Sequence, residues 1–200
     1  MKRKIILCLI LMINSCTLSS FSKRKENKVP RQKHLEYLKL DKRYENKYFT
    51  INHPKGWKVI YKHEKVSDTS NDEYREYDII NQQEDGRWFK PQIKIVPSIF
   101  KFGVSLREWA NMSIWAKDNQ DNIMQYVGHT DIDSFTFSKY PALCVSFIYR
   151  NELNDTIIQQ QIIVKKELGN NLFYVNLIFN KKEYEAWFLG ARMLNTFKIK

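Results

Sequence analysis

The sequence predicts an α+β fold, with an antiparallel sheet of about six to seven strands flanked by helices. Two observations predict it. Many short segments, separated by turn residues, repeat apolar residues at every second position, as strands do. Two longer segments instead repeat apolar residues at helical spacing, and each begins with a helix-start signal. Because strands outnumber helices and follow one another directly, we expect an antiparallel sheet with helices packed on it.

The predicted strands occupy the chain from residue 48 onward. A turn at His53-Pro54-Lys55-Gly56 separates the first two strands. Asp85-Gly86 is a strong hairpin signal between the next two. The predicted set is 48–52, 57–61, 77–82, 88–96, 126–131, 135–138, 143–150, 156–165 and 172–179.

Two helices are predicted between these strands. Ser105-Leu106-Arg107-Glu108 has the pattern of a capping box and predicts a helix that ends near Asp121. Its sheet-facing residues are predicted to be Leu106, Trp109, Ala110, Ser113 and Ala116. Asn180-Lys181-Lys182-Glu183 predicts a second helix start by the same logic. Its apolar stripe is predicted to be Tyr184, Trp187, Phe188, Ala191 and Leu194.

Residues 1–15 have the pattern of an export signal. Three basic residues precede nine consecutive apolar residues at 5–13, a run well short of the roughly 20 that a membrane-spanning helix needs. The following Ile13-Asn14-Ser15-Cys16 resembles the lipobox of bacterial lipoproteins, in which the cysteine receives a diacylglycerol. The sequence therefore predicts lipidation at Cys16. The alternative is a general secretory signal in which Cys16 has no role.

The positive charge lies mainly near the start of the chain. The formal net charge is +11, but residues 17–65 alone carry +9 and residues 66–200 carry −1. This distribution predicts a basic tether at 16–47 and a globular domain at 48–200, with a short amphipathic helix possible at 32–45. The tether suits either anionic lipid head groups or a solvated linker. Because the domain lacks a basic surface excess, no nucleic-acid partner is expected.

Single reactive residues give weak signals. Cys144 lies in an apolar strand without a nearby cationic residue, so we expect a buried thiol and not a nucleophile. The acidic stretch with Asp72, Glu73, Glu76 and Asp78 is expected to line a surface loop or an edge strand. A hydrolase would need two carboxylates at a defined separation in a cleft, which the sequence alone does not show.

No metal, cofactor or catalytic site is expected. The four histidines have no recognised metal-binding spacing, and the weak candidates for a metal site are His129, Asp131 and Asp133, alternate residues that would share one face of an extended strand. Phosphate-binding glycine motifs and the GxSxG motif are absent from the sequence. Most of the aromatic residues have core spacing. Trp88 and Phe89, after the Asp-Gly turn, are the most plausible exposed pair and are predicted to contact a partner.

Three stretches together resemble one family. Residues 49–57 (FTINHPKGW) are similar to the opening of PsbP-like domains, and residues 139–142 (KYPA) to their mid-domain turn. The closing strand and helix, ending in Met193-Leu194-Asn195-Thr196-Phe197, resemble the end of these domains. The superfamily includes the bacterial lipoprotein DcrB. The resemblance implies an α/β/α sandwich over residues 48–200, without shared catalytic residues, and members that mostly bind other proteins.

These observations together predict a non-catalytic lipoprotein of the cell envelope, anchored through Cys16, that binds or helps to assemble another envelope protein. Thr17 follows Cys16, so an aspartate that would favour the inner membrane is absent, and a periplasm-facing location at the outer membrane is expected. The alternatives are a carrier of an apolar ligand, a metal-dependent envelope hydrolase and a small inhibitor of one specific partner.

Overall fold

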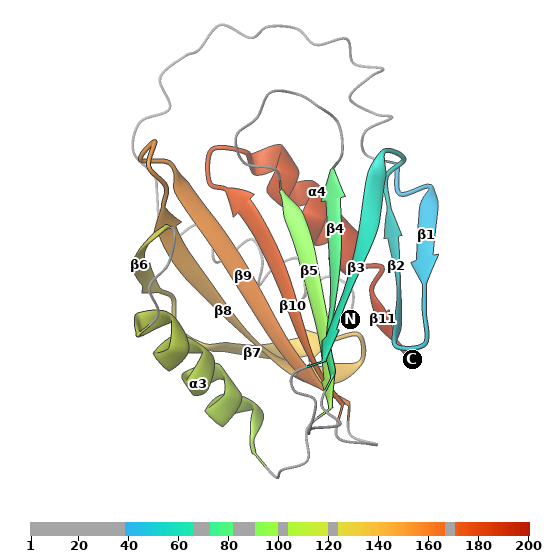
Figure 1. Ribbon diagram of the computed structural model, residues 1–200, viewed down its shortest axis with the longest axis horizontal. Helices are drawn as coiled ribbons and strands as arrows, with labels where there is room; N and C mark the ends of the chain where they lie inside the picture. The colour runs from blue at the N-terminus through green and yellow to red at the C-terminus, as the bar shows by residue number, and fades with distance from the viewer. Residues whose placement is uncertain (1–38, 66–72, 82–90, 100–103, 120–123, 167–170) are drawn as a thin grey trace, which may run out of the picture. The chain divides into compact units, whose positions relative to one another are not determined.

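Two antiparallel sheets form the fold seen in the computed structural model, which describes residues 39–65, 73–81, 91–99, 104–119, 124–166 and 171–200 (Figure 1). Nine of the eleven described strands were expected from alternating apolar residues. The eight-stranded sheet contains, in spatial order, β3 (Trp57–Lys65), β4 (Glu73–Asn81), β5 (Gln92–Ile99), β10 (Asn171–Asn180), β9 (Thr156–Lys165), β8 (Tyr140–Arg150) and β6 (Gln125–His129), and β7 (Asp133–Phe137) also pairs with β8.

A second sheet of three strands lies beside the first. It contains β1 (Lys42–Glu45), β2 (Phe49–His53) and β11 (Lys198–Ile199), with β2 in the middle. The described sheets are therefore larger than the six to seven strands predicted. Strand β1 also lies inside the stretch predicted as tether and as a possible helix. Strands β1 and β11 are only four and two residues long, and both pair with β2. The local sequence does not reveal such pairing, so neither strand was predicted.

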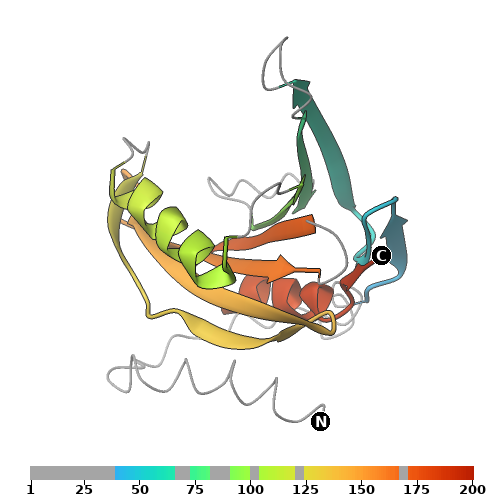
Figure 2. The ribbon, with the colours of Figure 1, turned by 90° about the horizontal axis from the view of Figure 1, so that it is seen from below.

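The two helices lie on opposite faces of the large sheet, α3 (Leu106–Asp118) on one and α4 (Tyr184–Leu194) on the other (Figure 2). The predicted capping box of α3 is present: the Glu108 amide donates to Ser105 Oγ at 3.2 Å, and the Ser105 amide donates to Glu108 Oε2 at 2.7 Å. The helix ends three residues before the predicted end. Ala116 is exposed, contrary to prediction, and Ile114 packs against the core instead.

The start of α4 differs from the predicted cap. Glu183 is the N-cap residue, without a side-chain cap, because Asn180 still belongs to β10 and its Oδ1 accepts from the Lys182 amide at 3.0 Å. Phe188, predicted in the apolar stripe, is exposed. The buried face of α4 is rotated relative to the predicted stripe. It includes Ala186, Trp187, Leu189, Gly190, Met193 and Leu194.

An aromatic cluster joins the two sheets on the face opposite α3. Phe197, just before β11, has its ring centroid 5.3 Å from Phe49 of β2, 5.4 Å from Phe137 of β7 and 6.4 Å from Phe173 of β10. All four rings are buried. Such clusters bury a large apolar area, so this face is closed by packing.

Helix α4 approaches β10 closely at Gly190, and this contact generates a prediction. A Cβ at Gly190 would lie 2.3 Å from Leu177 Cδ1 and 3.3 Å from Leu177 Cγ. Leu177 is buried, so its side chain can move away only by displacing the residues packed around it. Gly190→Ala should lower the free energy of unfolding by about 1–3 kcal/mol in urea titration, despite alanine's better helix propensity.

A rescue variant provides the control. Combining Gly190→Ala with Leu177→Val removes part of the clash, so the double variant should lose less than the sum of the two single losses. Unchanged or increased stability of Gly190→Ala alone would show that the helix does not pack this closely.

Candidate functional site

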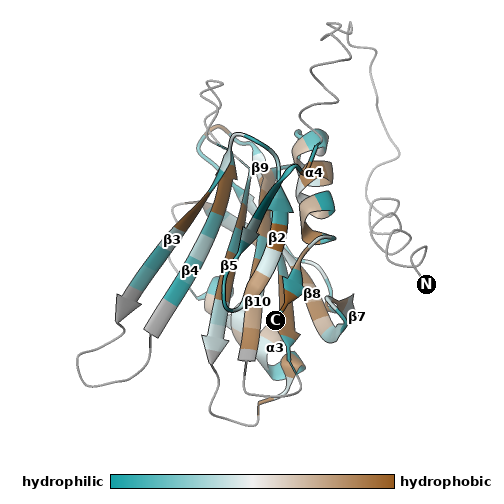
Figure 3. Cartoon of the chain, turned by 90° about the vertical axis from the view of Figure 1, so that its right-hand side faces the viewer, coloured by the Kyte–Doolittle hydropathy of each residue, from teal (hydrophilic) through white to brown (hydrophobic). Residues whose placement is uncertain are grey.

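Two buried carboxylates lie near the middle of β4. Glu76 and Asp78 are only 4% and 6% exposed. The expectation of a surface loop or an edge strand is wrong for both, because β4 pairs with β3 on one side and with β5 on the other. Asp72 lies outside the described residues. Figure 3 shows that β3 and β4 become hydrophilic toward the ends where β3 finishes and β4 begins.

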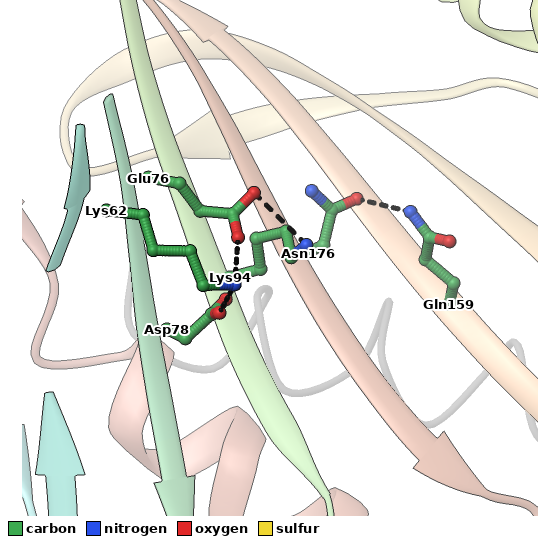
Figure 4. A network of polar contacts seen from close by, with 6 residues as sticks. All are labelled: Lys62, Glu76, Asp78, Lys94, Gln159 and Asn176. Carbon is green, nitrogen blue, oxygen red and sulfur yellow. Dashed lines mark hydrogen bonds and ion pairs between the residues drawn. The ribbon is translucent and has the colours of Figure 1, made fainter. Parts of the chain in front are cut away.

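Lysines from both neighbouring strands neutralise these acids. Lys62 Nζ of β3 lies 2.9 Å from Glu76 Oε1 and 2.7 Å from Asp78 Oδ2, and Lys94 Nζ of β5 lies 3.1 Å from Glu76 Oε2 (Figure 4). Hydrogen bonds to Asp78 and then Glu76 hold the pKa of Lys62 well above its usual value. The carboxylates thus bind lysines and do not pair with each other.

Uncharged polar groups lie next to these ion pairs on the neighbouring strands of the sheet. Gln159 Nε2 of β9 donates to Asn176 Oδ1 of β10 at 2.8 Å, and the Tyr149 hydroxyl of β8 lies 3.4 Å from Gln159 Oε1. Burial, and then Tyr126, raises the pKa of Tyr149 to about 12, so its hydroxyl remains a donor at neutral pH. A second group of polar contacts, on β8, β9 and β10, therefore lies next to the ion pairs, with Asn176 paired in register with Lys94.

Four polar side chains on four neighbouring strands stand directly beside one another in the pairing of the strands. We call them the polar row. The row is Asp78 of β4, Lys94 of β5, Asn176 of β10 and Gln161 of β9. Directly paired residues point to the same side of a sheet. Two oxygens of the row, Asp78 Oδ1 and Gln161 Oε1, are buried without a hydrogen-bond partner.

Helix α3 covers the apolar continuation of the same face. The row continues from Gln161 to Val145 of β8, which belongs to an apolar cluster against which Ile114 of α3 packs. Nearer the start of α3, Leu106, Trp109 and Ala110 pack with Leu143, Ile163 and Leu172. The polar row therefore lies beside the part of the sheet on which α3 packs.

The weak metal candidates do not assemble into a site. His129 is exposed at the end of β6, where its Nδ1 lies 2.8 Å from the Thr130 carbonyl oxygen. Asp131 is exposed, and Asp133 starts β7. Among the described residues, no group of three His, Cys, Asp or Glu side chains is placed to hold a metal ion.

Cys144 is a buried thiol on β8, as the sequence predicts. Burial, and then the charge of Asp133, raises its pKa to about 12. A nucleophilic cysteine needs a lowered pKa and access to solvent. Neither condition is met.

Cys16, Trp88 and Phe89 lie outside the described residues, so their predicted roles stay predictions. Other exposed apolar side chains are described. Trp115 and Met112 of α3 are 69% and 51% exposed. The sequence could have indicated that Trp115 is exposed. Trp109 and Trp115 are six residues apart, so they cannot share one face of the helix.

The described helices include none that is long and apolar enough to cross a membrane. No protein-family model matches the sequence, and no curated protein matches it.

Solved structures do match. The crystal structure of LpqN, involved in cell envelope biogenesis of Mycobacterium tuberculosis, has a TM-score of 0.52 and 14% identity, covering 76% of this chain and 83% of LpqN. The solution structure of PsbP (CyanoP) from the cyanobacterium Synechocystis sp. PCC 6803 also has a TM-score of 0.52, with 9% identity, covering 80% of this chain and 92% of CyanoP. The chain has a PsbP-like fold, which confirms the predicted resemblance.

The ion pairs on β4 lead to a stability prediction. Lys62→Met leaves Asp78 buried without its lysine and should lower the free energy of unfolding by about 2–3 kcal/mol. Lys58→Met is the matched control, because Lys58 is exposed on the same strand and face. It should change stability by less than about 0.5 kcal/mol. Equal decreases in the free energy of unfolding of the two variants would show that the ion pairs of Lys62 do not stabilise the fold.

The raised pKa of Cys144 leads to a second prediction. The raised pKa keeps Cys144 almost entirely as the thiol at pH 8, so iodoacetamide should modify it far more slowly in the native chain than in urea, as mapped by mass spectrometry. The folded chain holds this proton more tightly than the unfolded chain. The associated stability is therefore complete below the ordinary pKa of 9.0 and falls as the pH rises toward about 12. Rapid modification of the native protein at pH 8 would contradict the buried thiol.

Proposed function

We propose that this chain is a non-catalytic protein of the cell envelope, held at a membrane through a lipid on Cys16, that binds another envelope protein. The observation that carries the proposal is the PsbP-like fold, which LpqN, a protein involved in cell envelope biogenesis, shares. A fold alone does not determine a function. The export signal and the lipobox-like Ile13-Asn14-Ser15-Cys16 give independent support for an envelope location.

The state of the buried charges supports a non-catalytic role. A hydrolytic pair of carboxylates must face a scissile bond across a gap. Glu76 and Asp78 instead lie two residues apart on one strand, and both bind Lys62. Cys144 is buried with a raised pKa, so it does not supply a nucleophile in its place.

The outer face of α3 offers contact area for a protein partner. Met112 and Trp115 are three residues apart, and both side chains are largely exposed. Residues three apart are neighbours on a helix surface, and tryptophan is enriched among the residues that contribute most to protein interfaces. We place the partner contact here and the membrane attachment at Cys16, facing the periplasm at the outer membrane.

The attachment is tested by fractionation of cells that express the full chain. Cys16→Ser removes the thiol that would carry diacylglycerol, so the protein should move from the membrane pellet to the soluble fraction after a salt wash, because buried acyl carbons supply about 0.8 kcal/mol each. Cys8→Ser, in the apolar part of the signal, is the matched control and should stay in the pellet. A Cys16→Ser protein that still pellets would refute the lipid anchor.

The partner contact is tested by photo-crosslinking in cells. A photoreactive amino acid in place of Trp115 should give one dominant covalent adduct with an envelope protein. The same substitution at Leu153, an exposed apolar residue in the turn between β8 and β9, should not give it. Adducts of equal yield at both positions, or none at either, would count against a specific partner on α3.

A further inference from the structure

A group of aromatic side chains lies at β3, an edge strand of the large sheet (Figure 1). Tyr61 of β3 and Tyr77 of β4 are register partners, and their ring centroids lie 4.8 Å apart. The ring of Tyr44 in β1 lies 6.1 Å from Tyr77, and that of Phe49 in β2 lies 5.2 Å from it. The aromatic packing around Phe197 thus continues through Phe49 and Tyr77 to the edge of the sheet.

Basic side chains border these rings. Lys47 Nζ lies 4.9 Å from the ring centroid of Tyr48, and Arg75 Cζ lies 5.6 Å from the same centroid. His63 of β3 is the register partner of Arg75, and its ring centroid lies 6.1 Å from that of Tyr61. Directly paired residues point to the same side of a sheet. We define the aromatic–basic patch as Tyr44, Lys47, Tyr48, Tyr61, His63 and Arg75.

Three acids of the same strands lie on the other side of the backbone. Glu76 and Asp78 flank Tyr77 in β4, so they point to the opposite face of the sheet, where lysines bind them. Glu45 follows Tyr44 in β1 in the same way and forms ion pairs of its own. The patch therefore gathers rings and cations on the face from which these acids point away.

The patch is open to solvent, unlike the packed rings around Phe197. Tyr61 is 50% exposed. Lys47 and His63 are also exposed, and Tyr44 and Tyr48 are half-buried. A tyrosine has an apolar ring and a polar hydroxyl, and such residues are enriched where a protein meets the boundary between a membrane and water.

The charge near the patch is positive, and the chain arrives from Cys16 on this side of the domain. The described residues begin at 39, three positions before β1, which contains Tyr44. Residues 39–63 contain seven lysines and arginines but only two acids, and residues 17–38 carry a net charge of +4. Lys62 balances the buried acids of β4, and the other six basic side chains are exposed. A basic surface of this kind is complementary to anionic lipid head groups.

We propose that the aromatic–basic patch lies on the surface of an anionic phospholipid bilayer, with Tyr61 among the head groups and Lys47 and Arg75 beside their phosphates. The row that begins at Asp78 continues to the strands under α3, so the patch, on the opposite face, leaves α3 accessible to a partner. The inference rests on the membrane location in the proposed function, but the contact itself requires no acyl chain on Cys16.

Photo-crosslinking to lipid tests the contact. The full chain, as cells process it, carries a photoreactive amino acid in place of Tyr61 and is mixed with vesicles of phosphatidylglycerol and phosphatidylcholine. Irradiation should give a phospholipid adduct on the peptide that contains residue 61. The same substitution at exposed Trp115 of α3 or at exposed Leu153 should give at least fivefold less adduct. No lipid adduct at 61, or equal yields at 61 and 153, overturns the proposal.

Charge variants of the chain labelled at residue 61 connect the contact to the patch. Lys47→Gln should lower the adduct yield about fivefold, since one basic residue near an anionic surface contributes about that factor. Arg107→Gln is the matched control, because it removes the same charge from an exposed position on α3. It should leave the yield unchanged. Equal decreases in the two variants, or an undiminished yield with vesicles of phosphatidylcholine alone, overturn the proposal.

Two further readouts separate this proposal from the proposed function. Mass spectrometry of the peptide containing Cys16 reports the lipid anchor independently of the adduct. A lipid adduct at residue 61 with unmodified Cys16 supports the patch and refutes the anchor, whereas acylated Cys16 with no adduct at 61 does the reverse. Irradiation of cells that express the same chain tests a protein occupant. A dominant protein adduct at residue 61 in place of lipid overturns the proposal.

Discussion

A carboxylate buried in a sheet must have a positive charge beside it, and this requirement shapes one face of the protein. Glu76 and Asp78 of β4 meet it with Lys62 from β3 and Lys94 from β5. Removal of either charge from water costs several kcal/mol unless its partner is well placed. Because the centre of this face is occupied by ion pairs, α3 packs on the apolar residues of β8 and β9 instead.

The opposite face of the large sheet is covered by apolar packing, so the buried charges lie on the α3 face. There, α4 packs on Leu177 of β10, and aromatic contacts around Phe197 join the three-stranded sheet to the large sheet. The PsbP-like fold thus provides a scaffold with one closed face and one mixed face. On the mixed face, Asp78 Oδ1 and Gln161 Oε1 are buried without a hydrogen-bond partner.

Much of the fold could be predicted from local pattern, because the pattern there agrees with the packing. Strand β9 has the predicted bounds of 156–165, and Ser105 caps α3 as expected. The candidate site could not be predicted in this way. The acidic stretch around Glu76 and Asp78 has the composition of an exposed segment, and only pairing with β3 and β5 buries it. The compensating lysines stand 14 or more positions away in the sequence, where nothing links them to the acids.

The central claim is that the buried acids of β4 need the lysines of β3 and β5 beside them, whereas the fold does not need the charged network as a whole. The most direct test is the free energy of unfolding, measured by urea titration, of a variant in which Lys62, Glu76, Asp78 and Lys94 are all replaced by leucine. Buried ion pairs can often be replaced by apolar residues of similar volume without loss. The account predicts a stability within about 1 kcal/mol of the wild type, or higher. A loss of more than about 3 kcal/mol, or a chain that does not fold, would contradict it.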